Sequence, residues 1–273
     1  MDLNRAVTIL TGASRGIGAR VAEALAGKGA RLALAARSKD ALEQTAERVR
    51  ALGGEAITVP TDVTSNAELE QLVARTQEEL GPPDVLINNA GIECVGYFEK
   101  LDPHQIDATI ATNLTAPIAL ARLVAPIMID QGRGHICNIA SAAGKAARPY
   151  GVVYSGTKHG LVGFSWGLRA ELAPRGVEVS VVCPGYVTGE GMFAEREGHA
   201  GKPPRNLGMS TPQRVADEVI ASIEKNRAEV VIAPALVRVS DVFHAISPDF
   251  AIGVARRTGL YAYLRREATG DES

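Results

Sequence analysis

Aromatic residues are scarce in this chain of 273 residues: Phe, Tyr and Trp together make up 4% of it, with a single Trp. Cysteine is also rare, and Cys94, Cys137 and Cys183 stand too far apart for a metal-binding motif or a disulfide framework. We interpret them as small buried residues of a protein in a reducing compartment. The five histidines form no ligand pattern, so we expect no metal.

An excess of charge of either sign is absent as well. The chain has 29 basic and 31 acidic residues and a formal charge of −2, which excludes the basic footprint of a nucleic-acid-binding protein. No basic, then apolar, leader precedes the first expected strand. The longest apolar stretch, Leu114–Ile129, contains Arg122 and two prolines, so we expect no membrane span. These features predict a cytoplasmic protein.

Short apolar runs that alternate with amphipathic helical patterns are what the chain does contain. This alternation predicts an α/β protein: a single Rossmann-type domain with a doubly wound parallel sheet of about seven strands and helices on both faces. The expected strands are Ala6–Leu10, Arg31–Ala36, Ala56–Pro60, Asp84–Ile87, His135–Ala140, Glu178–Cys183 and Glu229–Ala233.

Three longer segments qualify this picture. Pro103–Gln131 fits one extended helix, bent at Pro117 and Pro126. Within residues 1–235, residues 189–210 have loop composition and are predicted to form a mobile substrate lid. Residues 236–273 are predicted to be a helical extension of the same domain, in two pieces broken at Ser247-Pro248.

A glycine-rich turn, Thr11–Gly18, follows the first strand and opens a helix. Glycines in this context let the backbone approach a pyrophosphate, which then lies at the positive end of the helix. The spacing is Gly-x-x-x-Gly-x-Gly rather than Gly-x-Gly-x-x-Gly. The interpretation is a dinucleotide-binding loop; an ordinary tight turn is the alternative.

The residue after the second strand indicates which dinucleotide. A fold specific for NAD usually has an acid there, about 20 residues after the glycines; here Ala36 occupies the place and Arg37 follows. Arg37 and Arg15 favour a 2′-phosphate and therefore NADP(H), unless both are solvated surface residues. Asp62, after the third strand, either contacts an adenine amino group or caps the next helix.

Tyr154 and Lys158 are four residues apart and so share one face of a helix. A phenol has a pKa of about 10, and lowering it to about 7 takes roughly 4 kcal/mol, which a nearby ammonium can supply. Ser141 ends the fifth strand, 13 residues before Tyr154. Asn113 lies inside the long helix, an unfavourable place for Asn unless its polar groups are used.

Together these motifs resemble the short-chain dehydrogenase/reductase family. The matches are Thr11–Gly18, Asp62-Val63, Asn88–Gly91, Asn113, Ser141, Tyr154 with Lys158, and Pro184-Gly185, in the family's order over residues 6 to about 233.

The resemblance implies a role for each catalytic residue. Tyr154 is expected to exchange a proton with the substrate oxygen as hydride moves, and Ser141 to bond that oxygen. Lys158 is expected to hold the nicotinamide ribose and lower the Tyr154 pKa. Asn113 is expected to position, through its backbone, a water for proton relay.

The resemblance also implies the cofactor contacts, with Asn89 to Gly91 on the adenosine side and Pro184 to Thr188 on the nicotinamide side. The full expected set is Gly12, Ser14, Arg15, Gly16, Ile17, Gly18, Arg37, Ser38, Asp62, Val63, Asn89, Ala90, Gly91, Tyr154, Lys158, Pro184, Gly185, Val187 and Thr188. One departure affects this set: the family's usual Pro-Gly-x-Val-x-Thr has its threonine one residue early here, at Thr188.

The predicted function is hydride transfer between NADP(H) and a carbonyl or secondary alcohol, in a homodimer or homotetramer by resemblance. Alternatives are an NAD-dependent alcohol dehydrogenase and a catalytically idle nucleotide sensor. The substrate is expected to be hydrophobic, such as a ketone, 3-oxoacyl thioester or steroid, with Cys94, Ala142, Ala143, Arg148, Tyr150, Tyr186, the lid and the tail near it. The tail is interpreted as a packed terminal helix, a substrate flap or partner surface, or a peripheral membrane contact.

Overall fold

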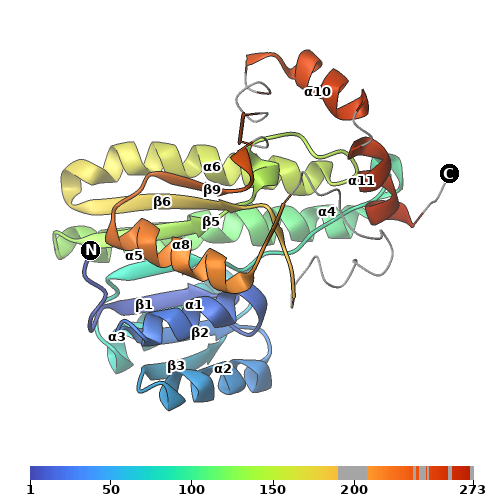
Figure 1. Ribbon diagram of the computed structural model, residues 1–273. Coiled ribbons are helices and arrows are strands. Elements are labelled where there is room, and N and C mark those ends of the chain that lie inside the picture. Colours follow the sequence, from blue (N-terminus) through green and yellow to red (C-terminus); the bar gives the residue numbers. More distant parts are fainter. Residues whose placement is uncertain (190–207, 236–237, 240–243, 245, 258–259, 271–273) are drawn as a thin grey trace.

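Seven parallel strands form the central sheet of the computed structural model, which describes residues 1–189, 208–235, 238–239, 244, 246–257 and 260–270. The strand order is β3-β2-β1-β4-β5-β6-β9 (Figure 1), so the predicted fold class is confirmed. The strands are β1 (Val7–Thr11), β2 (Arg31–Ala36), β3 (Glu55–Pro60), β4 (Val85–Asn88), β5 (Gly134–Ile139), β6 (Val177–Pro184) and β9 (Glu229–Ile232).

Helices cover both faces of this sheet, which explains why the strands read as continuous apolar runs. One face is covered by α1 (Gly16–Ala26), α2 (Lys39–Ala51) and α8 (Pro212–Glu224), which share a core with it. The other face is covered by α3 (Asn66–Glu79), α5 (Ala116–Asp130) and α6 (Val152–Leu172). Each fully buried Leu or Val in these layers contributes about 1.5–3 kcal/mol.

Side chains cap the starts of two of these helices. The Ser65 side chain accepts a hydrogen bond from the Glu68 amide, and that of Thr211 accepts one from Arg214. Each satisfies an N–H group that the first helical turn leaves without a partner.

The predicted long helix contains one irregular turn. It consists of α4 (Pro103–Ile110), a π-helical turn (Ala111–Thr115) and α5, so the irregular turn lies directly before Pro117, one of the two prolines at which a bend was predicted. Pro117 has no N–H to donate to the Asn113 carbonyl four residues earlier, and a widened turn accommodates that lost bond.

By length and composition this helix is also, within the described part of the chain, the one candidate for crossing a membrane: Pro103–Asp130 has 28 residues and a mean hydropathy of 1.4. Leu120, Val124 and Met128 are nevertheless buried against the sheet. This is the environment of a core helix.

The remaining elements lie around the carboxyl end of the sheet. Two short strands, β7 (Tyr186–Val187) and β8 (Met209–Ser210), pair in parallel, and the predicted lid between them falls largely outside the described residues. In the tail, α10 (Pro248–Arg257) begins at the predicted break, and α11 (Leu260–Thr269) is a second helix within the same predicted helical piece (Figure 1). Short 3₁₀ turns span Phe98–Lys100, Ala142–Gly144 and Ala173–Arg175.

Acid should destabilise this fold through His135 on β5. Its Nε2 lies 2.8 Å from the Ser180 hydroxyl, which donates its single proton to the Arg227 carbonyl, so Nε2 carries a proton and donates it to that hydroxyl. Burial lowers the pKa of His135 to about 3. Below pH 6.5 the unfolded chain therefore binds a proton that the folded chain refuses, and stability falls as the pH falls.

Between pH 7 and pH 5, we expect His135 alone to remove about 2 kcal/mol from the free energy of unfolding. Urea unfolding at the two pH values measures this loss. The His135→Gln variant, whose amide does not titrate, should lose correspondingly less over the same interval. An equal loss in both proteins would contradict the assignment.

Candidate active site

A cavity of about 850 Å³ runs along the carboxyl ends of the strands, where the strand order reverses between β1 and β4. Ligands of doubly wound proteins bind at this position. The structure brings most of the predicted site residues to its wall: Gly12, Ser14, Arg15, Gly16, Ile17, Gly18, Arg37, Ser38, Asp62, Val63, Asn89, Ala90, Gly91, Ser141, Tyr154, Lys158, Pro184, Gly185 and Val187.

The glycine turn has no room for side chains. Gly12 has a φ of 65°, and a Cβ there would lie 2.8 Å from the Ala90 Cα. A Cβ on Gly18 would lie 2.0 Å from the Gly12 carbonyl oxygen. The Asn89 side-chain amide, directly after the neighbouring strand β4, fixes the turn because it donates to the carbonyls of Thr11 and Gly12 at 3.0 Å each.

Among the described residues, no side chain caps the first turn of α1, and that turn forms part of the cavity wall. Its backbone N–H groups are therefore suited to an anion, with the helix dipole adding to the attraction. The glycine cradle and this helix start together fit the pyrophosphate of a dinucleotide.

Arg15 and Arg37 are exposed at the rim of this half of the cavity. Ser38 caps α2 through the Ala41 amide. Asp62 accepts hydrogen bonds from the amide and the hydroxyl of Thr64, which lower the pKa of its carboxyl. Asp62 is thus both a turn-capping residue and part of the cavity wall.

Tyr154 and Lys158 lie on one face of α6, at the other half of the cavity. Both are buried, with 6% and 3% of their surface exposed, and the ammonium lies 5.7 Å from the centre of the phenol ring. The Lys158 ammonium donates to the Ile139 carbonyl at 3.0 Å. The end of β5 thus fixes the ammonium that α6 carries near the phenol.

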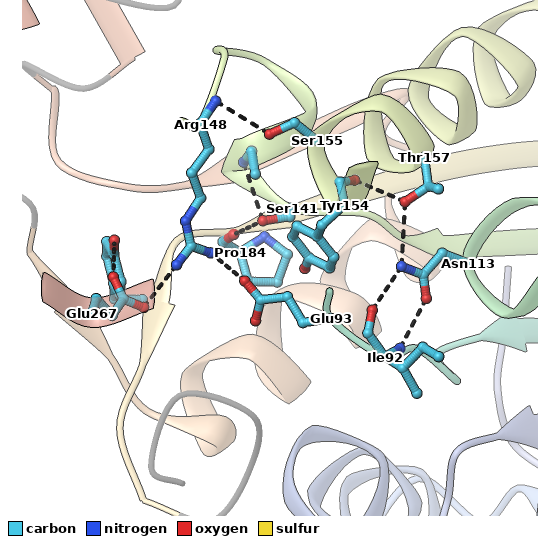
Figure 2. Close-up of polar contacts among 12 residues, drawn as sticks. Ile92, Glu93, Asn113, Ser141, Arg148, Tyr154, Ser155, Thr157, Pro184 and Glu267 are labelled. Carbon is cyan, nitrogen blue, oxygen red and sulfur yellow. Dashed lines mark hydrogen bonds and ion pairs between the residues drawn. The ribbon is translucent and has the colours of Figure 1, made fainter. Parts of the chain in front are cut away.

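Ser141 lies beside Tyr154 (Figure 2). Its hydroxyl accepts a hydrogen bond from the Ala143 amide at 3.1 Å and donates a longer one, 3.4 Å, to the Pro184 carbonyl. Because this donated bond is long and therefore weak, the hydroxyl can turn toward a substrate oxygen at little cost in free energy.

Asn113 is fully buried in the π-helical turn, behind the cavity wall. Its carboxamide accepts from the Ile92 amide at 2.9 Å and donates to the Ile92 carbonyl at 2.8 Å and to Thr157 at 3.3 Å (Figure 2). Thr157 in turn donates to the Tyr154 carbonyl. The carbonyl and amino groups of this mid-helix Asn side chain are therefore both hydrogen-bonded, as its unfavourable position suggested.

Comparison with known proteins identifies the family. A family model described as short chain dehydrogenase matches residues 6–199. The ketoacyl reductase HetN of Nostoc is 40% identical over 265 residues, covering 95% of this chain and 91% of HetN. The chain belongs to the short-chain dehydrogenase family.

Solved structures agree with this short-chain dehydrogenase in fold. A metagenomic short-chain oxidoreductase in complex with NADP superposes with a TM-score of 0.73 at 34% identity, covering 85% of this chain and 98% of that one. A variant of actinorhodin polyketide ketoreductase with NADPH gives a TM-score of 0.80 at 31% identity, with coverages of 87% and 98%.

Electrostatics distinguishes Lys158 within the site of this short-chain dehydrogenase. Burial lowers the pKa of its ammonium to about 8, while Cys183 and Glu93 act in the opposite direction. The group is therefore protonated at neutral pH and starts to lose its charge in mildly alkaline solution.

Two predicted residues, both in the described part of the chain, lie off the cavity wall. Asn113 stands behind it, and Thr188 bonds elsewhere: its hydroxyl donates to the Ser210 carbonyl at 3.1 Å. The early position of Thr188 in the motif thus places it in the β7–β8 pair. Of the expected substrate residues, Ala142, Ala143, Arg148 and Tyr186 line the cavity, whereas Cys94 and Tyr150 do not.

Sequence reasoning missed Glu93 and Glu267. Both line the cavity and pair with Arg148 (Figure 2). Leu260 and Leu264 of α11 also contribute to the wall, so this helix of the tail is packed and forms part of the pocket. The pattern of the tail suggested a packed helix, but neither acid carries a local signal of its partner.

Removing the Asn113 carboxamide should be costly. In Asn113→Ala, the N–H and C=O groups of Ile92 lose their partners inside the protein, which should lower the free energy of unfolding by about 3 kcal/mol. Chemical denaturation measures it. Asn66→Ala, an exposed position at the start of α3, is the control and should change stability by less than about 0.5 kcal/mol. Equal effects of the two substitutions would refute the buried bonding role.

Proposed function

We propose that this short-chain dehydrogenase is an NADP(H)-dependent reductase of apolar carbonyl compounds and that its preferred substrates are 3-oxoacyl esters or thioesters. The observation that carries the proposal is that the buried Tyr154 and Lys158 and the half-buried Ser141 meet at the cavity whose wall also contains the glycine turn. HetN, named a ketoacyl reductase, and the actinorhodin ketoreductase support the substrate class.

The chemistry divides between cofactor and chain. When bound, the nicotinamide supplies or accepts the hydride. Tyr154 gives its proton to the carbonyl oxygen, or takes it from the alcohol in the reverse direction. Ser141 donates to the same oxygen where negative charge develops.

Lys158 and Asn113 support the proton transfer. The charged Lys158 favours ionisation of Tyr154 and is placed to hold the ribose hydroxyls of the cofactor. The Asn113 carbonyl lacks its usual helical donor because residue 117 is proline, which suits it to hold a water for proton relay.

The cofactor preference rests on the rim of the other half of the cavity. Ala36, Arg37 and Arg15 line it, so the position of the usual ribose-binding acid is occupied by a methyl group with cations beside it. A guanidinium binds a phosphate through charge-assisted hydrogen bonds and gains little from a neutral hydroxyl.

The substrate preference rests on the opposite wall. Four alanines and two leucines contribute to it: Ala142, Ala143, Ala146, Ala147, Leu260 and Leu264. Small apolar side chains leave space for an acyl chain and offer it no hydrogen bonds. This wall favours an apolar group next to the reacting carbonyl.

Fluorescence titration should show tighter binding of NADPH than of NADH. In Arg37→Ala, we expect NADPH affinity to fall about tenfold or more, since a charge-assisted bond contributes about 1.5–3 kcal/mol. NADH affinity should stay nearly constant. A wild type that binds NADH equally well would overturn the cofactor assignment and point to an NAD-dependent alcohol dehydrogenase.

Tyr154→Phe should reduce turnover by about 10²–10⁴, the usual contribution of a positioned general acid, while the affinity for NADPH is retained. Steady-state reduction of a 3-oxoacyl thioester measures the loss. Tyr97→Phe removes a phenol outside the cavity wall and serves as the control. Undiminished turnover in Tyr154→Phe would sink the proposed mechanism.

A further inference from the structure

Three buried charged residues, Glu93, Arg148 and Glu267, form an ion triad in the wall of the cavity. The Arg148 guanidinium pairs with Glu93 through one nitrogen and with Glu267 Oε1 through the other, the latter at 2.7 Å (Figure 2). The side chains of Glu93, Arg148 and Glu267 are only 9%, 16% and 1% exposed. The reaction outlined above uses none of the three.

The triad joins segments that are far apart in the chain. Glu93 follows β4, and Arg148 precedes α6, where its amide donates to the Ser155 hydroxyl at 3.2 Å. Glu267 is on α11, 119 residues after Arg148. Its second carboxylate oxygen accepts from the Tyr186 hydroxyl at 3.2 Å. The Glu267 carboxylate of α11 thus bonds to two separate segments of the catalytic domain, the loop before α6 and strand β7.

Apolar contacts reinforce this attachment. Tyr263 and Leu264 of α11 are 2% and 5% exposed and pack with Tyr150 and Tyr186. Tyr186 also lies 5.9 Å beneath the Arg148 cation. The helix is therefore fixed by a charged and an apolar set of contacts on the same loops.

Burial makes the charged contacts decisive. Exposed ion pairs contribute little to stability, but a charge buried without its partner is strongly unfavourable. Although burial opposes the charge of Arg148, Glu93 and Glu267 raise the pKa of its guanidinium, so the cation persists at all ordinary pH values.

We propose that Arg148 and Glu267 latch α11 onto the catalytic domain, so that Leu260 and Leu264 form the wall that contacts the apolar chain of the substrate. In this role Arg148 and Glu267 are positioning residues. The inference rests on the proposed function for the identity of the substrate, whereas the latch itself is independent of it. NADP(H) affinity should not depend on the latch, because the glycine turn lies at the other half of the cavity.

Hydrogen exchange tests the latch without any substrate. In Glu267→Gln, which keeps the shape and removes the charge, amides of residues 260–270 should exchange at least about tenfold faster than in wild type. Glu55→Gln is the matched control. It breaks an exposed pair with Arg31, 2.7 Å long, at the opposite edge of the sheet, and should leave that exchange unchanged. Equal exchange in wild type and Glu267→Gln would overturn the latch.

Kinetics then tests the wall. We compare 3-oxobutanoyl and 3-oxodecanoyl thioesters of N-acetylcysteamine, which differ only in chain length. In Glu267→Gln, KM for the long substrate should rise about tenfold, the equivalent of about 1.4 kcal/mol, with kcat, the short substrate and the NADPH affinity little changed. A merely structural role would instead alter both substrates and NADPH alike, and that result would refute the wall.

Leu264→Ala provides an independent variant if Glu267→Gln is poorly folded. It shortens the wall, leaves all three ionic groups in place, and should raise KM selectively for the long substrate. No selective rise in a folded Leu264→Ala protein would overturn the proposal. If the wild type reduced neither thioester, the proposed function would fail, while the exchange experiment would still decide the latch.

Discussion

The Asn89 carboxamide joins the two loops on which the site is built. It donates to two successive carbonyls of the glycine turn after β1, from the loop after β4. These are the neighbouring strands at which the strand order reverses. In return, the Thr11 hydroxyl accepts from the amides of Asn89 and Ala90 at 3.0 and 3.1 Å. Without this exchange, backbone groups at the end of a buried sheet would lack partners.

A second asparagine side chain, that of Asn113, bonds to the backbone in the same way, further along the loop that follows β4. Asn113 bonds both main-chain groups of Ile92, as a neighbouring strand would, and links them through Thr157 to the backbone of Tyr154. Tyr154, the proposed general acid, is thus supported by an amide side chain that substitutes for a backbone partner. Rigid support of this kind is needed because small displacements of a reacting group are costly for catalysis.

The sequence predicted the parts of the molecule that depend on local pattern. Arg31–Ala36 was placed to the residue as a strand, because an apolar run bounded by a turn and polar residues has few other structures. The π-helical turn was not predicted, since a missing N–H at Pro117 can be accommodated by a bend or by a widened turn.

Pairings between distant residues were beyond the sequence. The ion pair between Glu267 and Arg148 could not be predicted, because the two residues are 119 positions apart and meet only where α11 packs against the loop before α6. The position of Thr188 likewise depends on β8, whose two residues have no strand signal of their own. Long-range contacts decide both cases, and no window of neighbouring residues contains them.

The β7–β8 pair has a consequence for how the pocket can change. Tyr186 pairs with Met209 and Val187 with Ser210, and the Thr188 amide donates to Ser210 at 2.9 Å. The ends of the intervening segment are thus fastened at a fixed separation beside the cavity. Doubling the length of such a closed loop costs only about 0.6 kcal/mol in chain entropy. A change in the number of residues between the two strands therefore need not disturb the β7–β8 pairing beside the cavity.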